Sequence, residues 1–230
     1  MTVITINGQV GTGGQEIGTE VAQRLRLDYV DRLILAEAAK RLSATVEVLA
    51  EREQHSLTRN ERIAQFLQTL VERSAVSGAA GDPYFGGGIG GVLGQEYQDL
   101  VKEPITRADQ LKDEQFIEAT RAVILELARV GNAVIMGRAS NLILKGYPGA
   151  FHIGLVSTVE SRVKVVAERE RTSLQEAERR MTEAERARGS FFRKFFKASP
   201  DDPANFHVML NTHALDSERA ASIIVHAVSS

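Results

Sequence analysis

Short apolar runs alternate with helical stripes along this chain. Five runs have the length and the β-branched content of strands that are buried on both faces: Val3–Asn7, Leu27–Asp31, Ala133–Met136, Phe151–Val156 and Phe206–Asn211. Between them, apolar residues recur three and four positions apart, which is typical of amphipathic helices: Gln15–Leu25, Leu33–Leu42, Thr45–Arg52, Phe116–Val130, Val159–Arg169, Leu174–Phe196 and Asp216–Val228. This alternation predicts an α/β fold in which helices cover both faces of a five-stranded parallel sheet.

A glycine-rich run joins the first expected strand to the first expected helix. Strand, glycine turn and helix N-terminus in this order are the layout of a phosphate-binding loop, because helix N-terminal N–H groups bind anions and glycine lets the backbone approach them. The candidate phosphate-binding or nucleotide-binding residues are Gly8, Gly11, Thr12, Gly13, Gly14, Gln15 and Glu16. A tight strand-to-helix turn without a ligand remains the alternative.

The run departs from the full Walker A pattern, G-x-x-x-x-G-K-[ST]. Gly8 and Gly13 hold the two glycine positions, but Gly14 stands at the lysine position and Gln15 at the Ser/Thr position. Neither a point charge for the β- and γ-phosphates nor a hydroxyl for magnesium is supplied there. A dinucleotide-binding fingerprint fits less well, because Glu16 stands where its last glycine or alanine belongs.

Two further candidates follow from the expected sheet. Ligands of open parallel sheets bind at the carboxyl ends of the strands. The first strand ends at the glycine run, the second at Asp31 and the third at Gly137-Arg138, so we expect these ends to form one crevice. Arg138 and Asp31 are therefore candidate acceptor-binding residues, although Asp31 is also a suitable helix cap.

Composition narrows the choice of partners and compartment. The chain has 230 residues, a formal net charge of −2 and no cysteine. This charge gives no reason to expect nucleic acid or an anionic membrane as a partner. The absence of cysteine suits a reducing cytoplasm, and no apolar run reaches the roughly 20 residues that span a bilayer. The scattered histidines form no zinc-binding motif, and no G-x-S-x-G pattern of a serine hydrolase occurs.

The segment Gly78–Gly94 is compositionally unusual. It is rich in glycine, including Gly86-Gly87-Gly88, and it contains Tyr84 and Phe85. A flexible surface insertion and a flap that covers a substrate are both consistent with this composition, and the sequence does not separate them.

Together these motifs resemble the cytidylate kinase-like family, a branch of the P-loop nucleoside monophosphate kinases. The resemblance covers most of the chain and is poorest between Leu57 and Asp109. Relatives often have G-S-G-G-R-E-I in the glycine run, where this chain has Gln15 in place of the arginine. Many cytidylate kinases have G-R-D after the third strand, where this chain has Ala139 in place of the aspartate. The third stretch is Glu178–Phe196, in which Arg188 matches a lid arginine and Glu185 stands where an aspartate is common, followed by Asn205–Asn211.

This resemblance implies a three-layer P-loop NTPase-like sandwich. One kinase-like domain would span residues 1–230, with a helical, glycine-rich insertion at about 57–109 and a lid at about 172–200. ATP with Mg²⁺ would be the cofactor, with Glu16 or Asp31 holding the ion directly or through water. Arg138 would hold the acceptor phosphate, and Arg188 and Arg186 would be catalytic.

The implied function is a cytoplasmic phosphotransferase that moves the γ-phosphoryl group of ATP to a small acceptor such as a nucleoside monophosphate. Two alternatives remain. One is a binding module for nucleotide or phosphate with weak or no catalysis, which the missing lysine favours. The other is a kinase for a non-nucleotide small molecule, because a fold does not fix a substrate. Arg186, Arg188 and Arg193 also lie in a charge-rich helix of the kind that forms a solvated face.

Overall fold

The computed structural model describes residues 2–31, 35 and 107–229. Apart from Leu35, the helices expected between 33 and 52 lie outside these residues, as do the Gly78–Gly94 segment and nearly all of the insertion expected at about 57–109. No helix in the described part of the chain is both long enough and apolar enough to cross a membrane.

The centre of the described fold is a parallel sheet. Its strands are β1 (Val3–Gly8), β2 (Asp28–Val30), β3 (Ala133–Met136), β4 (Ala150–Val156) and β5 (Val208–Asn211). They lie in the order β2-β3-β1-β4-β5, and every neighbouring pair is parallel. The predicted five-stranded parallel sheet is thus confirmed.

Helices follow the strands along the chain. They are α1 (Gly14–Leu25), α5 (Arg107–Val130), α6 (Ser140–Ile143), α7 (Val159–Glu170), α8 (Leu174–Phe196) and α9 (Ser217–Ser229), with a short 3₁₀ turn at Pro203–Asn205. The helix expected to start at Phe116 begins at Arg107 instead. The sequence did not predict these first turns, because they are polar and carry no apolar stripe. The four-residue helix α6 was not predicted, since it is too short to show periodicity.

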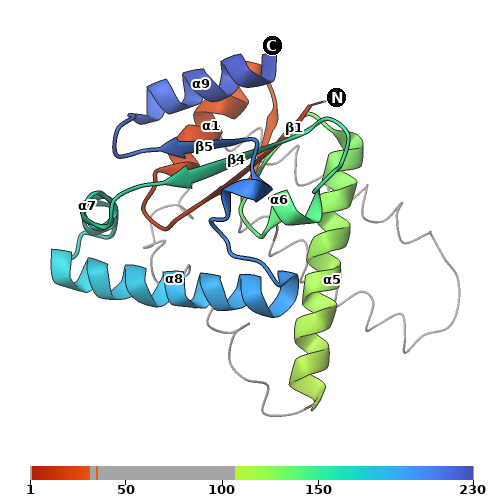
Figure 1. The fold of residues 1–230 in the computed structure, drawn as a ribbon, viewed down its shortest axis with the longest axis horizontal. Coiled ribbons are helices and arrows are strands. Elements are labelled where there is room, and N and C mark those ends of the chain that lie inside the picture. Colours follow the sequence, from red (N-terminus) through yellow and green to blue (C-terminus); the bar gives the residue numbers. More distant parts are fainter. Residues whose placement is uncertain (1, 32–34, 36–106, 230) are drawn as a thin grey trace, which may run out of the picture.

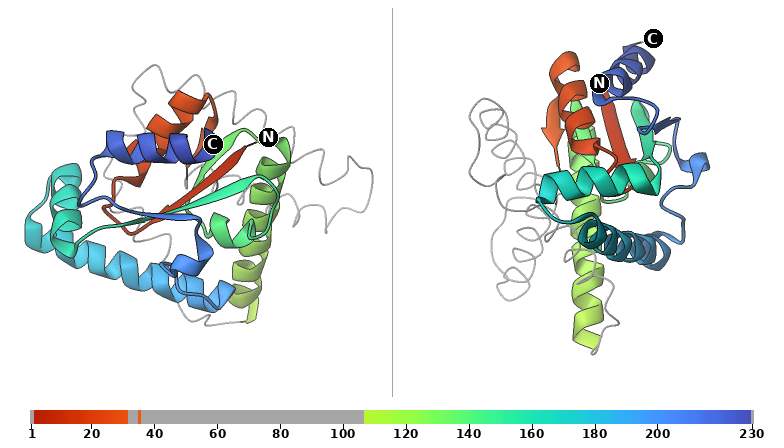
Figure 2. Two further views of the ribbon diagram at one scale, coloured as in Figure 1. Left: turned by 45° about the horizontal axis from the view of Figure 1, so that its top comes forward. Right: turned by 90° about the vertical axis from the view of Figure 1, so that its left-hand side faces the viewer.

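The sheet has a separate apolar core on each face. Alternate residues of β1 point to opposite faces, so Val3 packs in one core and Ile4 in the other. Val3 shares its core with Ile124 of α5, whereas Ile4 shares its core with residues of α1 and α9 such as Val21. Figures 1 and 2 show the same arrangement, with α1 and α9 on one side of the sheet and α5 and α6 on the other. The predicted three layers are therefore present.

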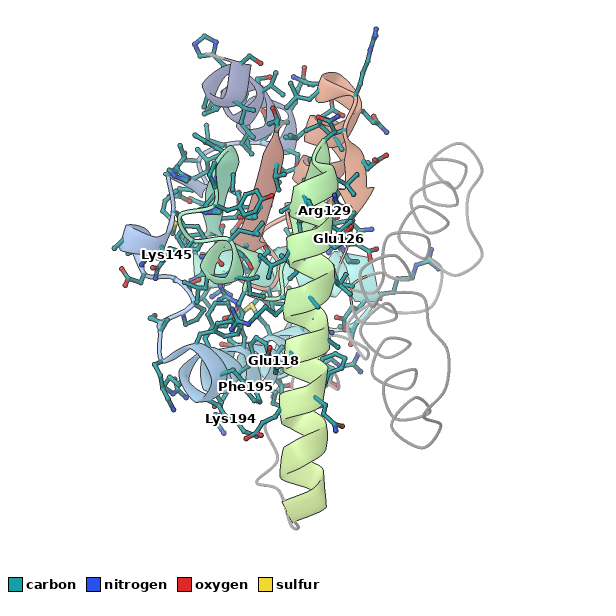
Figure 3. The ribbon with its side chains drawn as sticks, turned by 90° about the vertical axis from the view of Figure 1, so that its right-hand side faces the viewer. Glu118, Glu126, Arg129, Lys145, Lys194 and Phe195 are labelled. Carbon is teal, nitrogen blue, oxygen red and sulfur yellow. The ribbon has the colours of Figure 1, made fainter. Side chains whose placement is uncertain are left out.

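Helices α7 and α8 lie beside the layers rather than within them. Helix α7 follows the end of β4, and α8 runs from α7 across the molecule to α5 (Figure 1). Near its end, Phe191 and Phe192 form a third apolar cluster with Ile117 of α5 and with Ala139. Figure 3 shows the end of α8, with Phe195 labelled, beside α5. Helix α8 covers most of the segment that the family resemblance implies is a lid, and that role stays a prediction.

Candidate functional site

The glycine run forms a closed turn between β1 and α1. The amide and the hydroxyl of Thr12 both donate to the carbonyl of Gln9, at 3.3 and 2.7 Å. Gly11 and Gly13 have φ values of +86° and +72°, which L side chains rarely adopt. Gly13 is the N-cap of α1 and supplies no side-chain hydrogen bond to the first helical turn. The first N–H groups of a helix have no intrahelical acceptor, so this turn has the form of an anion-binding site.

Close packing also requires glycine in this run. A Cβ atom at Gly11 would lie 2.7 Å from the carbonyl oxygen of Arg162, and one at Gly8 would lie 2.7 Å from the Thr12 hydroxyl. Gly14 is less constrained, because its backbone is not left-handed and a Cβ atom there would lie 3.3 Å from Met136 Cε. The run is therefore held tightly against the start of α7.

A buried arginine from α7 reaches the glycine run. Arg162 is 6% exposed, and its Nη1 donates to the carbonyl of Val10 at 3.3 Å. The same nitrogen lies 3.2 Å from Oε1 of Glu185 on α8. That carboxylate oxygen also accepts a hydrogen bond of 2.6 Å from the backbone N–H of Val10. The glycine run, α7 and α8 are thus joined through one arginine and one carboxylate.

Arg188, the expected lid arginine, lies in the same network. It is 4% exposed, and its guanidinium donates to Asp201 Oδ1 at 2.6 Å and to Glu185 Oε2 at 3.1 Å. Its Cζ atom also lies 5.6 Å from the ring centroid of Phe192. Asp201 in turn accepts a hydrogen bond of 3.2 Å from Gln9 Nε2. Arg188 is therefore connected to the glycine run through Asp201 and Gln9, and its catalytic role stays a prediction.

Helix α8 carries two kinds of arginine. Arg188 is on the buried face, whereas Arg186 is exposed two positions earlier and lies outside the network of Glu185 and Asp201. Arg179 and Arg180 are on the solvent face, and their hydrogen bonds to Glu176 lower the pKa of that carboxyl to about 2. Position on the helix therefore separates Arg188 from its charged neighbours, and the catalytic role of Arg186 stays a prediction.

Arg138 lies in an unusual turn after β3. Gly137, Arg138 and Ala139 have φ values of +74°, +54° and +54°, so three successive residues are left-handed. For a residue other than glycine this conformation costs roughly 1–2 kcal/mol, and such strain is concentrated at functional sites. Arg138 is 2% exposed, with Cζ 5.8 Å from the ring centroid of Phe116. Ala139, at the position of the aspartate of many cytidylate kinases, is fully buried in the cluster with Phe191 and Phe192.

The predicted meeting of strand ends is confirmed for β1 and β3. Ile6 pairs with Met136, and the N–H of Gly137 donates to the carbonyl of Ile6 at 2.9 Å. The Asn7 side chain also donates to the Ser140 hydroxyl across this junction, at 3.2 Å. The carboxyl ends of these two strands, which lead into the glycine run and Arg138, are therefore adjacent.

The candidates Asp31 and Glu16 are not part of this junction. Asp31 follows β2, the edge strand, which β3 separates from β1, and its carbonyl accepts a turn hydrogen bond from Leu35. Glu16 is in the first turn of α1 and forms an ion pair with Arg169 of α7, while its side chain is 50% exposed. Among the described residues, no three potential ligand side chains converge in a way that could hold a metal ion.

Sequence reasoning missed Gln9, Arg162 and Asp201 as members of the network. Arg162 had a detectable signal, because it occupies a position of the apolar stripe that Val163 and Val166 continue on α7. Arg188 has the same property on α8, between Ala184 and Phe191. Gln9 and Asp201 gave no comparable signal, since both lie outside helices and strands and meet only in the folded chain.

Comparison with known proteins gives one family and several structural neighbours. The model of the cytidylate kinase-like family matches residues 3–214. A solved structure of an uncharacterized protein from Eubacterium ventriosum ATCC 27560 is 14% identical, with a TM-score of 0.64, over 100% of this chain and 99% of that chain. Shikimate kinase from Bacteroides thetaiotaomicron is 11% identical with a TM-score of 0.47, over 100% of this chain and 99% of that chain. Deoxyadenosine kinase from M. mycoides is 13% identical with a TM-score of 0.44, over 100% of both chains. The sequence matches no curated protein.

Proposed function

We propose that this chain, which belongs to the cytidylate kinase-like family, binds ATP at its glycine run and transfers the γ-phosphoryl group to a small acceptor such as a nucleoside monophosphate. One observation carries the proposal. Two buried arginines from different helices, Arg162 and Arg188, meet at a glycine run that has the form of an anion-binding turn.

Phosphoryl transfer suits this arrangement. The reaction requires positioning and charge neutralisation and makes little use of covalent chemistry by the protein. Backbone N–H groups within Gly11–Gln15 would hold the donor phosphates, apart from that of Thr12, which already donates to the Gln9 carbonyl. The two guanidinium groups would supply the positive charge that Gly14 does not. Arg138, at the adjacent strand end, would hold the acceptor phosphate.

Magnesium would bind together with ATP. Mg²⁺ in such sites is bound by one or two carboxylates together with substrate phosphates and water. Glu16 is the candidate carboxylate, because its Oε2 lies 3.8 Å from where a Cβ atom of Gly13 would be. The Thr12 hydroxyl is a weaker candidate, since it donates to the Gln9 carbonyl. When bound, the ion would neutralise charge on the phosphates.

A binding module with weak or no catalysis is the second candidate. It is favoured by Gly14 and Gln15 at the positions of the catalytic lysine and hydroxyl, and by the ion pairs that already neutralise Arg162 and Arg188. A kinase for a non-nucleotide small molecule would use the same donor site with another acceptor.

A panel of acceptors separates these functions. The protein is incubated with ATP and Mg²⁺ and with nucleoside monophosphates, nucleosides or small hydroxylated metabolites, and release of ADP is measured. We expect ADP release above the rate without acceptor for at least one nucleoside monophosphate. Turnover with only a non-nucleotide acceptor would show that the protein is a kinase for a non-nucleotide small molecule. Tight ATP binding in calorimetry without any turnover would favour the binding module.

A further inference from the structure

Three hydrogen-bond donors from three separate segments converge on the carboxylate of Glu185. The Val10 N–H lies 2.6 Å from Oε1, Arg162 Nη1 lies 3.2 Å from Oε1, and Arg188 Nη1 lies 3.1 Å from Oε2. The Glu185 side chain is 23% exposed. The carboxylate therefore occupies a partly enclosed position between the glycine run and two guanidinium groups.

This set of donors is suited to a phosphate oxyanion. Guanidinium groups form charge-assisted hydrogen bonds with carboxylates and phosphates in the same geometry, and backbone N–H groups of turns add to such sites. A phosphate oxygen could accept the same three hydrogen bonds. A phosphate oxygen on the Val10 N–H would take the place of Glu185 Oε1, and its charge would repel the carboxylate at this distance, so the two groups compete for this position.

The donors are held in place by contacts that do not involve Glu185. Arg162 Nη1 also donates to the Val10 carbonyl at 3.3 Å, and Val10 packs against the apolar contact of α7 with α8. Asp201 accepts two hydrogen bonds from Arg188, at 2.6 and 3.3 Å. Nε of Arg162 is buried and has no hydrogen-bond partner among the described residues. Loss of the Glu185 charge would thus leave the three donors in position, with the Val10 N–H and Arg162 short of an anion.

We propose that Val10 N–H, Arg162 and Arg188 form an oxyanion subsite that Glu185 fills from within the chain, so that a ligand phosphate must displace this carboxylate. Glu185 then sets the affinity of the site for phosphates, since every binding event includes the loss of its three hydrogen bonds. The identity of the ligand as a nucleotide rests on the proposed function, whereas the subsite and its competitor do not.

Substitution of the carboxylate by its amide tests the competition. Glu185→Gln keeps the size of the side chain and removes its charge, and inorganic pyrophosphate is the probe in calorimetry. We expect pyrophosphate to bind about tenfold more tightly to Glu185→Gln than to the unmodified protein, which corresponds to about 1.4 kcal/mol. Glu183→Gln is the matched control, because Glu183 is on the solvent face of the same helix and accepts a hydrogen bond from Arg179. Unchanged or weaker binding by Glu185→Gln would overturn the proposal.

Two further measurements test the proposal, and the second does not depend on the stability of Glu185→Gln. In the double variant Glu185→Gln/Arg162→Gln, we expect the gain in pyrophosphate affinity to disappear. In a crystal of the unmodified protein with pyrophosphate, we expect a phosphate oxygen on the Val10 N–H and the Glu185 carboxylate displaced from it. Pyrophosphate bound elsewhere on the glycine run, with Glu185 still on Val10, would contradict the inference. Failure of the kinase proposal would show separately, as absent ADP release with this competition intact.

Discussion

Burial determines how the two central arginines can act. A guanidinium that is removed from water needs an anionic partner, because a buried unpaired charge costs several kcal/mol. Arg162 and Arg188 have Glu185 and Asp201 for this purpose. Glu185 would be exchanged for phosphate oxygens when a ligand binds, whereas Asp201 would keep Arg188 in place. The residues that stabilise the ligand-free molecule are thus those that would bind the ligand.

At Arg188 we predict an effect on turnover rather than on affinity. Because Glu185 and Asp201 neutralise Arg188 in the ligand-free state, Arg188→Ala should change ATP affinity by only a few-fold. Turnover should fall by roughly a hundredfold or more, the scale of other groups that stabilise a transition-state charge. Steady-state kinetics and calorimetry measure the two effects, and circular dichroism verifies the fold. The control is Arg193→Ala, which removes an exposed arginine of the same helix. Equal behaviour of the two variants would remove Arg188 from the catalytic site.

Gly11 and Gly146 differ in why a position needs glycine: close packing in addition to backbone conformation at Gly11, and backbone conformation alone at Gly146. Both have a left-handed φ, +86° at Gly11 and +76° at Gly146. An added Cβ atom at Gly11 would lie 2.7 Å from the Arg162 carbonyl oxygen, whereas one at Gly146 would meet nothing within 4 Å. We predict that Gly11→Ala lowers the free energy of unfolding more than Gly146→Ala, by about 1–3 kcal/mol, the usual cost of overpacking. Urea denaturation measures both, and equal losses would show that backbone strain alone matters at Gly11.

Candidate site residues could be predicted where a pattern in the nearby sequence marks them. The glycine run, Arg138 and Arg188 follow from spacing, from strand ends or from the family resemblance. Arg162 was detectable only as a charge in an apolar stripe, and Asp201 was not detectable, because its partner Gln9 is far away in the sequence. Networks that join distant segments depend on tertiary contacts, which apolar periodicity does not encode.

At the scale of elements, strands were more predictable than helix ends. The five strands lie close to their expected positions because each is a short apolar run between polar turns. Helix α5 starts earlier than expected, since polar helix-forming residues at Arg107–Gln115 continue the helix without an apolar face. Helix α6 consists of only four residues and follows a left-handed turn, so neither periodicity nor capping residues predict it.

The junction of β1, β4 and β5 gives a prediction about pH. His152 of β4 is buried, its Nδ1 lies 2.9 Å from the Thr5 hydroxyl, and its ring stacks on that of His207. Burial, and secondarily the charge of His207, lower the pKa of His152 below its usual value of 6.5. The unfolded chain therefore binds a proton at this residue more readily than the folded chain. Stability should be lost as pH falls below about 6.5 toward the lower pKa of the folded state.

Thermal melts between pH 7.5 and pH 5.5 measure this dependence. We expect the melting temperature to fall more in the unmodified protein than in His152→Asn, which cannot take up the proton. His207→Asn is the second comparison, because His207 stacks on His152 and accepts a hydrogen bond from its backbone N–H. Parallel melting curves for the unmodified protein and His152→Asn would show that other groups cause the acid sensitivity.

On the scale of the whole molecule, the sheet order brings the site together. Strand β1 lies between β3 and β4, so the glycine run meets the Arg138 turn on one side and the start of α7 on the other. Helix α8 then joins these parts to α5 through its aromatic end (Figure 1, Figure 3). The sequence predicted the adjacency of the β1 and β3 ends, but the position of α8 against the glycine run depends on packing that only the folded chain shows.

Ligand binding at this meeting point should stabilise the entire fold. A ligand at 100 times its Kd, bound only by the folded state, raises the free energy of unfolding by about 2.7 kcal/mol. We therefore predict that ATP raises the melting temperature, and that Gly14→Asp abolishes this rise. The new carboxylate would lie in the first turn of α1, where phosphate charge is expected, and its Cβ atom would lie 3.3 Å from Met136 Cε. Gly146→Ala should keep the full ATP shift, because Gly146 lies in the turn that follows α6 and an added Cβ atom there meets nothing within 4 Å. A full shift in Gly14→Asp would place the nucleotide away from α1, and no shift in the unmodified protein would refute nucleotide binding itself.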